Sequence, residues 1–129
     1  MEISIDDFKK VEIKIGEIKS AEKIEGSDKL LKLIVNFGLK PSVSTEGSAD
    51  HPTSDGLGEQ DIRQVLSGIA AYFPEPKDLV GKRCPFATNL APRMMMGLES
   101  QAMILATGGD GETPFALFET TGVPGARVR

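Results

Sequence analysis

Alternating apolar and charged residues mark the first predicted strand. Residues 11–15 place apolar side chains at every second position, which is the period of a strand with one buried face. Gly16 interrupts this alternation and Ile18 resumes it, as expected for a bent or bulged strand. A turn signal at 25–28 then precedes a second apolar run at 30–35, which ends in β-branched residues. The first part of the chain therefore predicts two neighbouring strands.

The second half contains further extended segments and one short helix. Residues 74–80 predict the helix, because a proline lies at their start, acidic residues come early and Gly81 follows as a stop. Residues 89–99 predict a loop, since they include Pro92 and Gly97. Strand-like sequence occupies the other segments, at 63–70, 82–88, 101–106 and 115–118 and at Val128.

The segment between the second and third predicted strands has a different composition. Residues 38–60 are rich in proline, glycine and small polar residues and have little apolar content. They predict a long exposed loop between two strands, and we expect a mobile acidic loop at 39–61. Residues 41–61 hold five acidic residues and no lysine or arginine, a local charge of −5 against −4 for the whole chain. The remainder is thus slightly basic, which permits a basic patch on one face.

Five main strands with one short helix between the third and fourth predict a small closed barrel. Closure hides the edges that so many short strands would otherwise expose, and the five-stranded OB-fold has this order of elements. The fold class is therefore all-β, a five-stranded OB-fold barrel with one short helix, in a single domain over residues 1–129. The 40% of hydrophobic residues suffices for one core. No apolar stretch is long enough to span a membrane, and one cysteine without a signal peptide indicates a cytoplasmic protein.

Catalytic and metal chemistry are poorly supported. His51 is the only histidine and has no cysteine cluster to join, so neither a metal nor another cofactor is expected. Cys84 follows Arg83, which would lower its pKa, but a core position in a strand is the favoured alternative. There is no Gly-x-Ser-x-Gly elbow and no histidine base for a serine nucleophile. The chain is therefore expected to bind rather than to catalyse.

The segment 89–97 carries the best binding chemistry. Asn89 suits hydrogen bonds to base edges, and Arg93 suits phosphate contact and base stacking. The three methionines at 94–96 either present flexible apolar surface or, as the favoured alternative, plug one end of the barrel. Lys29 and Arg83 are further candidate phosphate contacts.

Four blocks of this sequence resemble the tRNA-binding domain appended to methionyl-tRNA synthetases. They occur in the family's order, and the likeness extends over nearly the whole chain. The blocks are residues 23–33 (KIEGSDKLLKL), 63–69 (RQVLSGI), 87–93 (ATNLAPR) and 96–103 (MGLESQAM). The resemblance implies an OB-fold followed by a C-terminal extension, homodimeric in bacterial cases, that binds tRNA by shape. Such domains occur within synthetases, as separate small subunits and as free-standing proteins, and a related branch is described as an export chaperone.

The resemblance implies a non-catalytic tRNA-binding subunit or accessory of methionyl-tRNA synthetase, with that enzyme's catalytic chain as a partner. The alternative is an export-type peptide-binding chaperone that uses the methionines at 94–96. The tail at 123–129 resembles the family's dimer-forming end. Two features depart from the family: Met94 replaces the usual lysine after Pro-Arg, and the segment 41–61 is longer than the usual connection. Ser100 and Gln101 are placed by resemblance, as RNA contacts or as bonds that hold the barrel end. The expected RNA-binding residues are Lys29, Arg83, Asn89, Arg93, Ser100 and Gln101.

Overall fold

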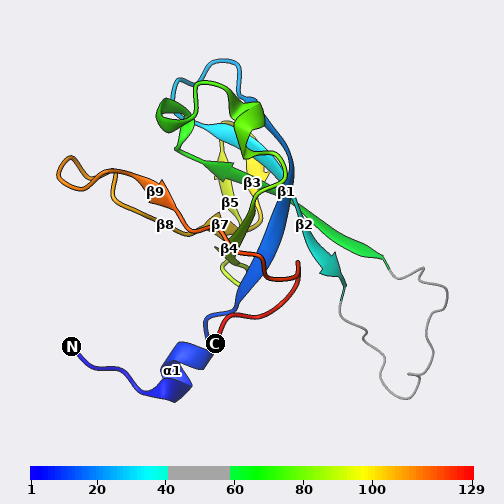
Figure 1. Cartoon of the computed structure of the whole chain (residues 1–129), viewed down its shortest axis with the longest axis vertical. Helices are drawn as coiled ribbons and strands as arrows, with labels where there is room; N and C mark the ends of the chain where they lie inside the picture. Colours follow the sequence, from blue (N-terminus) through cyan, green and yellow to red (C-terminus); the bar gives the residue numbers. More distant parts are fainter. Residues whose placement is uncertain (41–58) are drawn as a thin grey trace.

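The computed structural model describes residues 1–40 and 59–129. Strands dominate these residues (Figure 1). Two short 3-10 helices of the described residues are labelled η3 and η4. In chain order the elements are α1 (Ile5–Lys9), β1 (Ile13–Lys23), β2 (Leu31–Leu39), β3 (Gln60–Ser67), η3 (Ala70–Tyr72), η4 (Pro76–Leu79), β4 (Arg83–Ala87), β5 (Arg93–Met95), β6 (Leu98–Ser100), β7 (Met103–Ile104), β8 (Ala106–Thr107) and β9 (Ala116–Leu117).

One antiparallel sheet with the strand order β3-β2-β1-β4-β7 forms the body of the molecule and curls on itself (Figure 1). Its long central strand β1 pairs with β4 near its start and with β2 over its second half. A bulge between Ile18 and Ser20 helps it bend. Gly16 sits where the sheet curls tightly, since a Cβ there would lie 2.5 Å from Cγ1 of Val35 and 2.7 Å from Cε1 of Phe37. The predicted bend in this strand is confirmed.

The barrel closes between β3 and the residues that precede β7. The backbone N–H of Gln101 donates to the carbonyl of Gln64 at 2.8 Å. The side-chain oxygen of Gln101 accepts from the N–H of Gln64 at 2.9 Å, and the hydroxyl of Ser100 accepts from the N–H of Leu66 at 3.0 Å. Side chains thus satisfy edge donors of β3 that would otherwise be exposed. The all-β, five-stranded OB-type class is confirmed.

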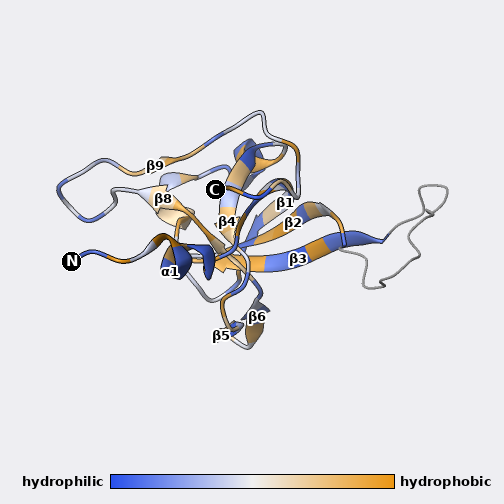
Figure 2. Ribbon diagram, turned by 90° about the horizontal axis from the view of Figure 1, so that it is seen from below, coloured by the Kyte–Doolittle hydropathy of each residue, from blue (hydrophilic) through white to orange (hydrophobic). Residues whose placement is uncertain are grey.

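The buried hydrophobic residues form one cluster inside the curled sheet. Hydrophobic residues recur along β2 (Figure 2), and every second residue of this strand from Leu31 to Phe37 is buried. Phe37 is 1% exposed and meets Phe86 of β4 edge to face, with ring centroids 5.2 Å apart. The core therefore lies between the two halves of the sheet.

A C-terminal extension follows the barrel, as the resemblance implies. Its first part forms the β8–β9 ribbon, where Phe115 stacks on Tyr72 with ring centroids 4.2 Å apart. Its last part runs along the start of β1, and the N–H of Gly125 donates to the carbonyl of Ile15 at 2.7 Å. Gly38 and Gly125 allow this docking: a Cβ on Gly38 would lie 2.6 Å from the carbonyl oxygen of Pro124. A Cβ on Gly125 would lie 2.5 Å from the carbonyl oxygen of Phe37, and both glycines have positive φ.

Several predicted elements need correction. The helix expected at 74–80 is the single 3-10 turn Pro76–Leu79, and the α-helix of the described residues is Ile5–Lys9 instead. This helix begins after Ser4, whose hydroxyl accepts the N–H of Asp7 at 3.1 Å, and acidic residues in the first turn favour it. The strand expected at 101–106 is divided into β7 and β8. No helix within the described residues is both long and apolar enough to cross a membrane.

The predicted loops are also shorter than expected. Residues 89–99 contain the hairpin of β5 and β6 rather than loop alone. The range expected for the acidic loop, 39–61, extends too far at both ends. Leu39 is the last residue of β2 and pairs with Gln60, the first residue of β3. Residues 41–58, including His51 and the predicted mobile part of the loop, lie outside the described residues.

Candidate nucleic-acid interface

Two loops meet at one end of the barrel. We call residues 24–30 the β1–β2 loop and residues 88–102 the β4–β7 loop; the latter contains the β5–β6 hairpin. Met96 and Gly97 form the tip of this hairpin, with φ of 52° and 78°. Cε of Met96 lies 3.6 Å from the place of a Cβ on Gly26, so the tip reaches the β1–β2 loop. OB-fold barrels bind oligonucleotides and oligosaccharides with these two loops and the strands between them.

Arg93 is presented at the base of the hairpin. It begins β5, pairs with Ser100 across the hairpin and is exposed. It lines a small hollow of about 60 Å³ together with Leu66, Leu90 and Met95. Among residues 1–40 and 59–129, no carboxylate lies within 4.0 Å of its guanidinium. Its charge is therefore available to an external anion.

Lys29 lies in the β1–β2 loop, on the element that the hairpin tip reaches. Its backbone is held, because its N–H donates to the Ser27 hydroxyl at 3.2 Å and its carbonyl accepts the N–H of Ala70 at 3.0 Å. Lys29 is exposed, and no carboxylate in the described part of the chain pairs with its side chain. Lys29 and Arg93 thus belong to two loops that touch each other.

Asn89 is already engaged within the chain. Its Oδ1 accepts the N–H of Glu12 at 2.8 Å, and its Nδ2 donates to the carbonyl of Lys10 at 2.7 Å. A base edge would have to displace both hydrogen bonds to be recognised by this amide. The geometry therefore favours Asn89 as an anchor that joins the start of the β4–β7 loop to the start of β1.

Ser100 and Gln101 occupy the closure of the barrel. Ser100 is 6% exposed, and its hydroxyl also donates to the carbonyl of Ala102 at 3.1 Å. Gln101 is half-buried and bonds Gln64 through both its backbone and its side chain. Of the two roles left open for this pair, the geometry favours the bonds that hold the barrel end.

Arg83 has neighbours outside the two loops. It lies on β4 opposite Glu17, with Nε 3.8 Å from Oε1 of that carboxylate. Its Nη1 donates to the carbonyl of Gly122 at 3.2 Å. These contacts tie Arg83 to β1 and the C-terminal extension, so the structure does not group it with Lys29 and Arg93 by any hydrogen bond or ion pair of the described residues.

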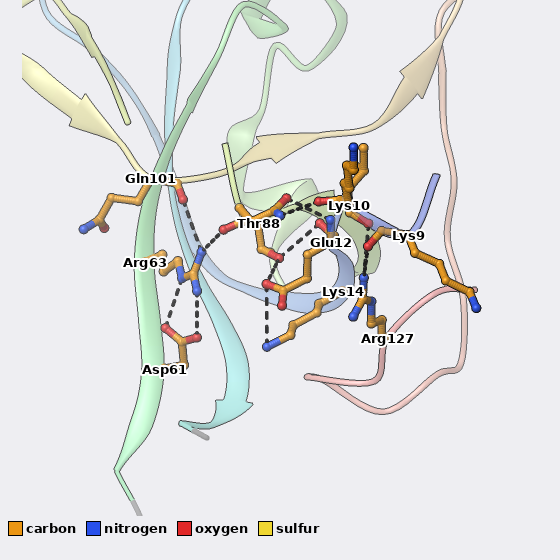
Figure 3. Close-up of polar contacts among 11 residues, drawn as sticks. Lys9, Lys10, Glu12, Lys14, Asp61, Arg63, Thr88, Gln101 and Arg127 are labelled. Carbon is orange, nitrogen blue, oxygen red and sulfur yellow. Dashed lines mark hydrogen bonds and ion pairs between the residues drawn. The ribbon is translucent and has the colours of Figure 1, made fainter. Parts of the chain in front are cut away.

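Arg63 was not among the predicted site residues, yet it is the centre of the polar network at the root of the β4–β7 loop (Figure 3). Its Nε and Nη2 bond the two oxygens of Asp61 at 3.1 Å each. The Asp-x-Arg spacing on β3 was the available signal, because residues two apart lie on one face of a strand. Asp61 is 8% exposed, so it belongs to this pair and not to an acidic loop.

The methionines of the hairpin and the single cysteine differ in burial. Met95 is half-buried against the hollow, whereas Met94 and Met96 are 67% and 55% exposed, so the three methionines are not buried together as a plug. Cys84 is fully buried, and desolvation by burial raises the pKa of its thiol to about 11, opposite to the effect expected from Arg83. The described residues hold no cluster of three metal-ligating side chains.

Lys40 and Glu59 pair where β2 ends and β3 begins. The N–H of Lys40 donates to the carbonyl of Glu59 at 2.8 Å, and their side chains pair at 3.4 Å. Lys40 follows the end of β2 and Glu59 precedes the start of β3, whereas the β1–β2 loop precedes the start of the nine-residue strand β2. Lys40 and Glu59 thus lie at the end of β2 that is away from the β1–β2 loop, which carries Lys29.

A family model described as a putative tRNA-binding domain matches residues 55–127. The chain belongs to this tRNA-binding domain family. It is 40% identical over 110 residues to a methionine–tRNA ligase of Lactiplantibacillus plantarum and 38% identical over 127 residues to one of Methanocella arvoryzae. These matches cover 85% and 98% of the chain but only 13% and 15% of the ligases, so the chain spans a small part of these relatives.

Solved structures extend the comparison over the full chain. A MetRS-related protein from Pyrococcus horikoshii has a TM-score of 0.76 and 32% identity, with 100% of both chains covered. The chaperone CsaA from Bacillus anthracis has a TM-score of 0.71 and 18% identity, also over 100% of both chains. The second likeness establishes the shared fold alone.

Proposed function

We propose that this chain is a non-catalytic tRNA-binding protein that acts as a small subunit of, or an accessory to, methionyl-tRNA synthetase in the cytoplasm. The observation that carries the proposal is the meeting of the β1–β2 loop with the β5–β6 hairpin in a member of the tRNA-binding domain family. These loops present Lys29 and Arg93, neither of which pairs with a carboxylate of the described residues. The similarity to methionine–tRNA ligases supports the choice of partner.

The proposed mechanism is binding by shape and charge. Lys29 and Arg93 contact phosphates of the RNA backbone, and the exposed face of the hairpin lies along it. Asn89, Ser100 and Gln101 hold the loop and the barrel end in the required position, while Arg83 is at most a peripheral contact. The whole chain acts as one binding domain and raises the local concentration of tRNA at the associated enzyme.

Replacement of Arg93 with alanine tests the proposed contact. We expect tRNA binding to weaken by about 1–2 kcal/mol, roughly tenfold, because a charged hydrogen bond to phosphate is lost. The slope of log affinity against log salt should also fall by about one unit. Binding of unfractionated tRNA to the parent and variant across a salt series measures both effects.

The matched control is Lys77→Ala, which removes an exposed charge from η4. We expect it to change tRNA affinity less than twofold, and circular dichroism should show that both variants fold. Equal tRNA affinity of the Arg93 variant and the parent would remove Arg93 from the interface. A parent chain that fails to bind tRNA at low salt would overturn the proposed function.

A peptide-binding chaperone is the alternative function. The exposed side chains of Met94 and Met96 favour it, because flexible apolar thioethers suit varied peptide surfaces. Binding through them would depend little on salt. A denatured polypeptide added to the same salt series distinguishes the two functions: it should leave the tRNA complex intact if the RNA function is correct, and bind in its place if the alternative is.

We also propose that the protein is a homodimer, so that two domains hold one tRNA. An apolar hollow of about 350 Å³ beside the C-terminal extension supports this, since its lining is almost entirely apolar: Ile13, Ile15, Pro85, Leu105, Phe118, Thr120 and Val128. We expect sedimentation equilibrium to give twice the 13.8 kDa chain mass and Phe118→Asp to give the monomer. A monomeric parent at high protein concentration would contradict the proposal.

A further inference from the structure

Both ends of the β4–β7 loop rest on one guanidinium. Nη1 of Arg63 donates to the carbonyl of Thr88 at 2.8 Å and to that of Gln101 at 3.4 Å (Figure 3). Thr88 is the first residue of this loop and Gln101 is the last but one. The hairpin that carries Arg93 lies between them, so one side chain contacts the chain where it leaves the barrel and where it returns.

The guanidinium itself is held by the core. Asp61 binds it through two hydrogen bonds, and its central carbon lies 5.3 Å from the centroid of the Phe37 ring. Phe37 is among the most deeply buried residues of the chain. A planar fork that is bound on three sides has little freedom to shift, and lysine has no equivalent of this fork. The guanidinium of Arg63 thus connects both ends of the loop to the barrel core.

Other bonds support one end each. At the first end, the N–H and hydroxyl of Thr88 donate to the carbonyl and the carboxylate of Glu12, at 2.8 Å and 2.6 Å. At the second end, Gln101 bonds Gln64 of β3. The β4–β7 pairing, with Ala87 opposite Met103, brings the two ends together. Within the described residues, Arg63 is the side chain whose hydrogen bonds join these ends, so it adds a fixed point at the root of the hairpin.

We propose that Arg63 is a positioning residue for RNA binding, which orients the β5–β6 hairpin so that Arg93 meets a phosphate of the bound RNA. This inference rests on the proposed tRNA function. Arg63 is half-buried, and its Nε, Nη1 and Nη2 each bond groups of the chain, so its proposed role is to act through the loop and not on the ligand. A hairpin that is ordered before binding loses less conformational entropy when the complex forms.

Arg63→Lys is the test variant, because it keeps a positive charge beside Asp61 and removes the fork. We expect tRNA affinity to fall about fivefold, a typical size for coupling through one positioning group. Hydrogen exchange should become faster at the amides of β5 and β6 and stay unchanged in β1 and β2. The matched control is Arg127→Lys: Nη2 of Arg127 also donates to two carbonyls, those of Lys9 at 2.9 Å and Val11 at 3.4 Å, but neither is in the β4–β7 loop. It should leave the exchange of β5 and β6 unchanged.

A double-mutant cycle separates positioning from a general loss of structure. If Arg63 acts through Arg93, Arg63→Lys should weaken tRNA binding less than twofold in the Arg93→Ala background. Additive losses, or an unchanged affinity of the single Arg63 variant, would overturn the inference. If Arg63→Lys does not fold, Asp61→Asn serves in the same cycle. This variant weakens the two hydrogen bonds from Asp61 to the guanidinium but retains the Arg63 side chain.

Failure of the tRNA function has a different signature. In that case the parent does not bind tRNA, whereas hydrogen exchange still reports whether Arg63 orders the hairpin. Unchanged exchange of β5 and β6 in the Arg63 variant would then overturn the positioning role on its own.

Discussion

Replacement of Phe37 with alanine should lower the free energy of unfolding by about 3–5 kcal/mol, the usual cost of a large cavity in a core. Phe37 is 1% exposed and packs edge to face on Phe86 across the barrel. It also lies under the guanidinium of Arg63, so the loss reaches the polar network. Urea denaturation followed by circular dichroism measures the effect.

Phe8→Ala is the control for this prediction, because Phe8 lies in α1 and is 37% exposed. We expect it to cost about 1 kcal/mol or less, as is usual near the surface. A loss below about 1 kcal/mol for the Phe37 variant would mean that the barrel collapses around the missing ring.

Asp61→Ala should be the second most damaging change, with a loss of about 3 kcal/mol in the free energy of unfolding. Removing one partner of a buried ion pair leaves the other charge without compensation, and that is more costly than the pair's net contribution. The side chains of Asp61 and Arg63 are only 11% and 23% exposed. Chemical denaturation at neutral pH gives the loss directly.

Glu59→Ala is the matched comparison for Asp61→Ala. Glu59 lies two residues earlier and pairs with Lys40, but its side chain is 78% exposed. We expect a change of about 0.5 kcal/mol or less, since solvent screens exposed pairs. Equal losses for the two variants would show that burial of the Asp61–Arg63 pair does not contribute to stability.

The barrel could be predicted from the sequence because its strands carry local signals. The alternation before Gly16 and its resumption at Ile18 located a bent strand, and β1 bulges after Ile18. The apolar run at 30–35 located β2, which buries every second residue from Leu31 to Phe37. Burial of one face of a strand produces an alternation between neighbouring residues, and this alternation can be recognised in a single sequence.

The β5–β6 hairpin was missed because its turn lacks the usual signal. Two-residue hairpin turns need positive φ at the central positions, and Asn-Gly or Gly-Gly normally marks them. Here Met96 takes a φ of 52° in front of Gly97, within a run of three methionines that shows no alternation. The short helix α1 was missed for a similar reason, since Asp6 and Asp7 suit a turn as well as a first helical turn.

The candidate site could be predicted only as far as side-chain chemistry suffices. Arg93 and Lys29 are exposed on loops that touch, as their charge suggested, and their contact with RNA stays a prediction. Asn89 and Ser100 have the right chemistry for recognition, but their polar atoms are bonded to backbone distant in the sequence. Those long-range partners depend on the closure of the barrel, and a local pattern holds no information about it.

Gly38 and Gly125 dock the C-terminal extension together, so substitutions at these two distant positions are expected to depend on each other during evolution. The space for a side chain on Gly38 is filled by the carbonyl of Pro124, and that for one on Gly125 by the carbonyl of Phe37. The backbone of the other segment fills the place of each missing side chain. A larger residue at either position would therefore displace the extension from β1. No smaller residue exists at the other position to compensate. The two sites are therefore tied as a pair, and a lineage that loses one glycine is released from the need to keep the other.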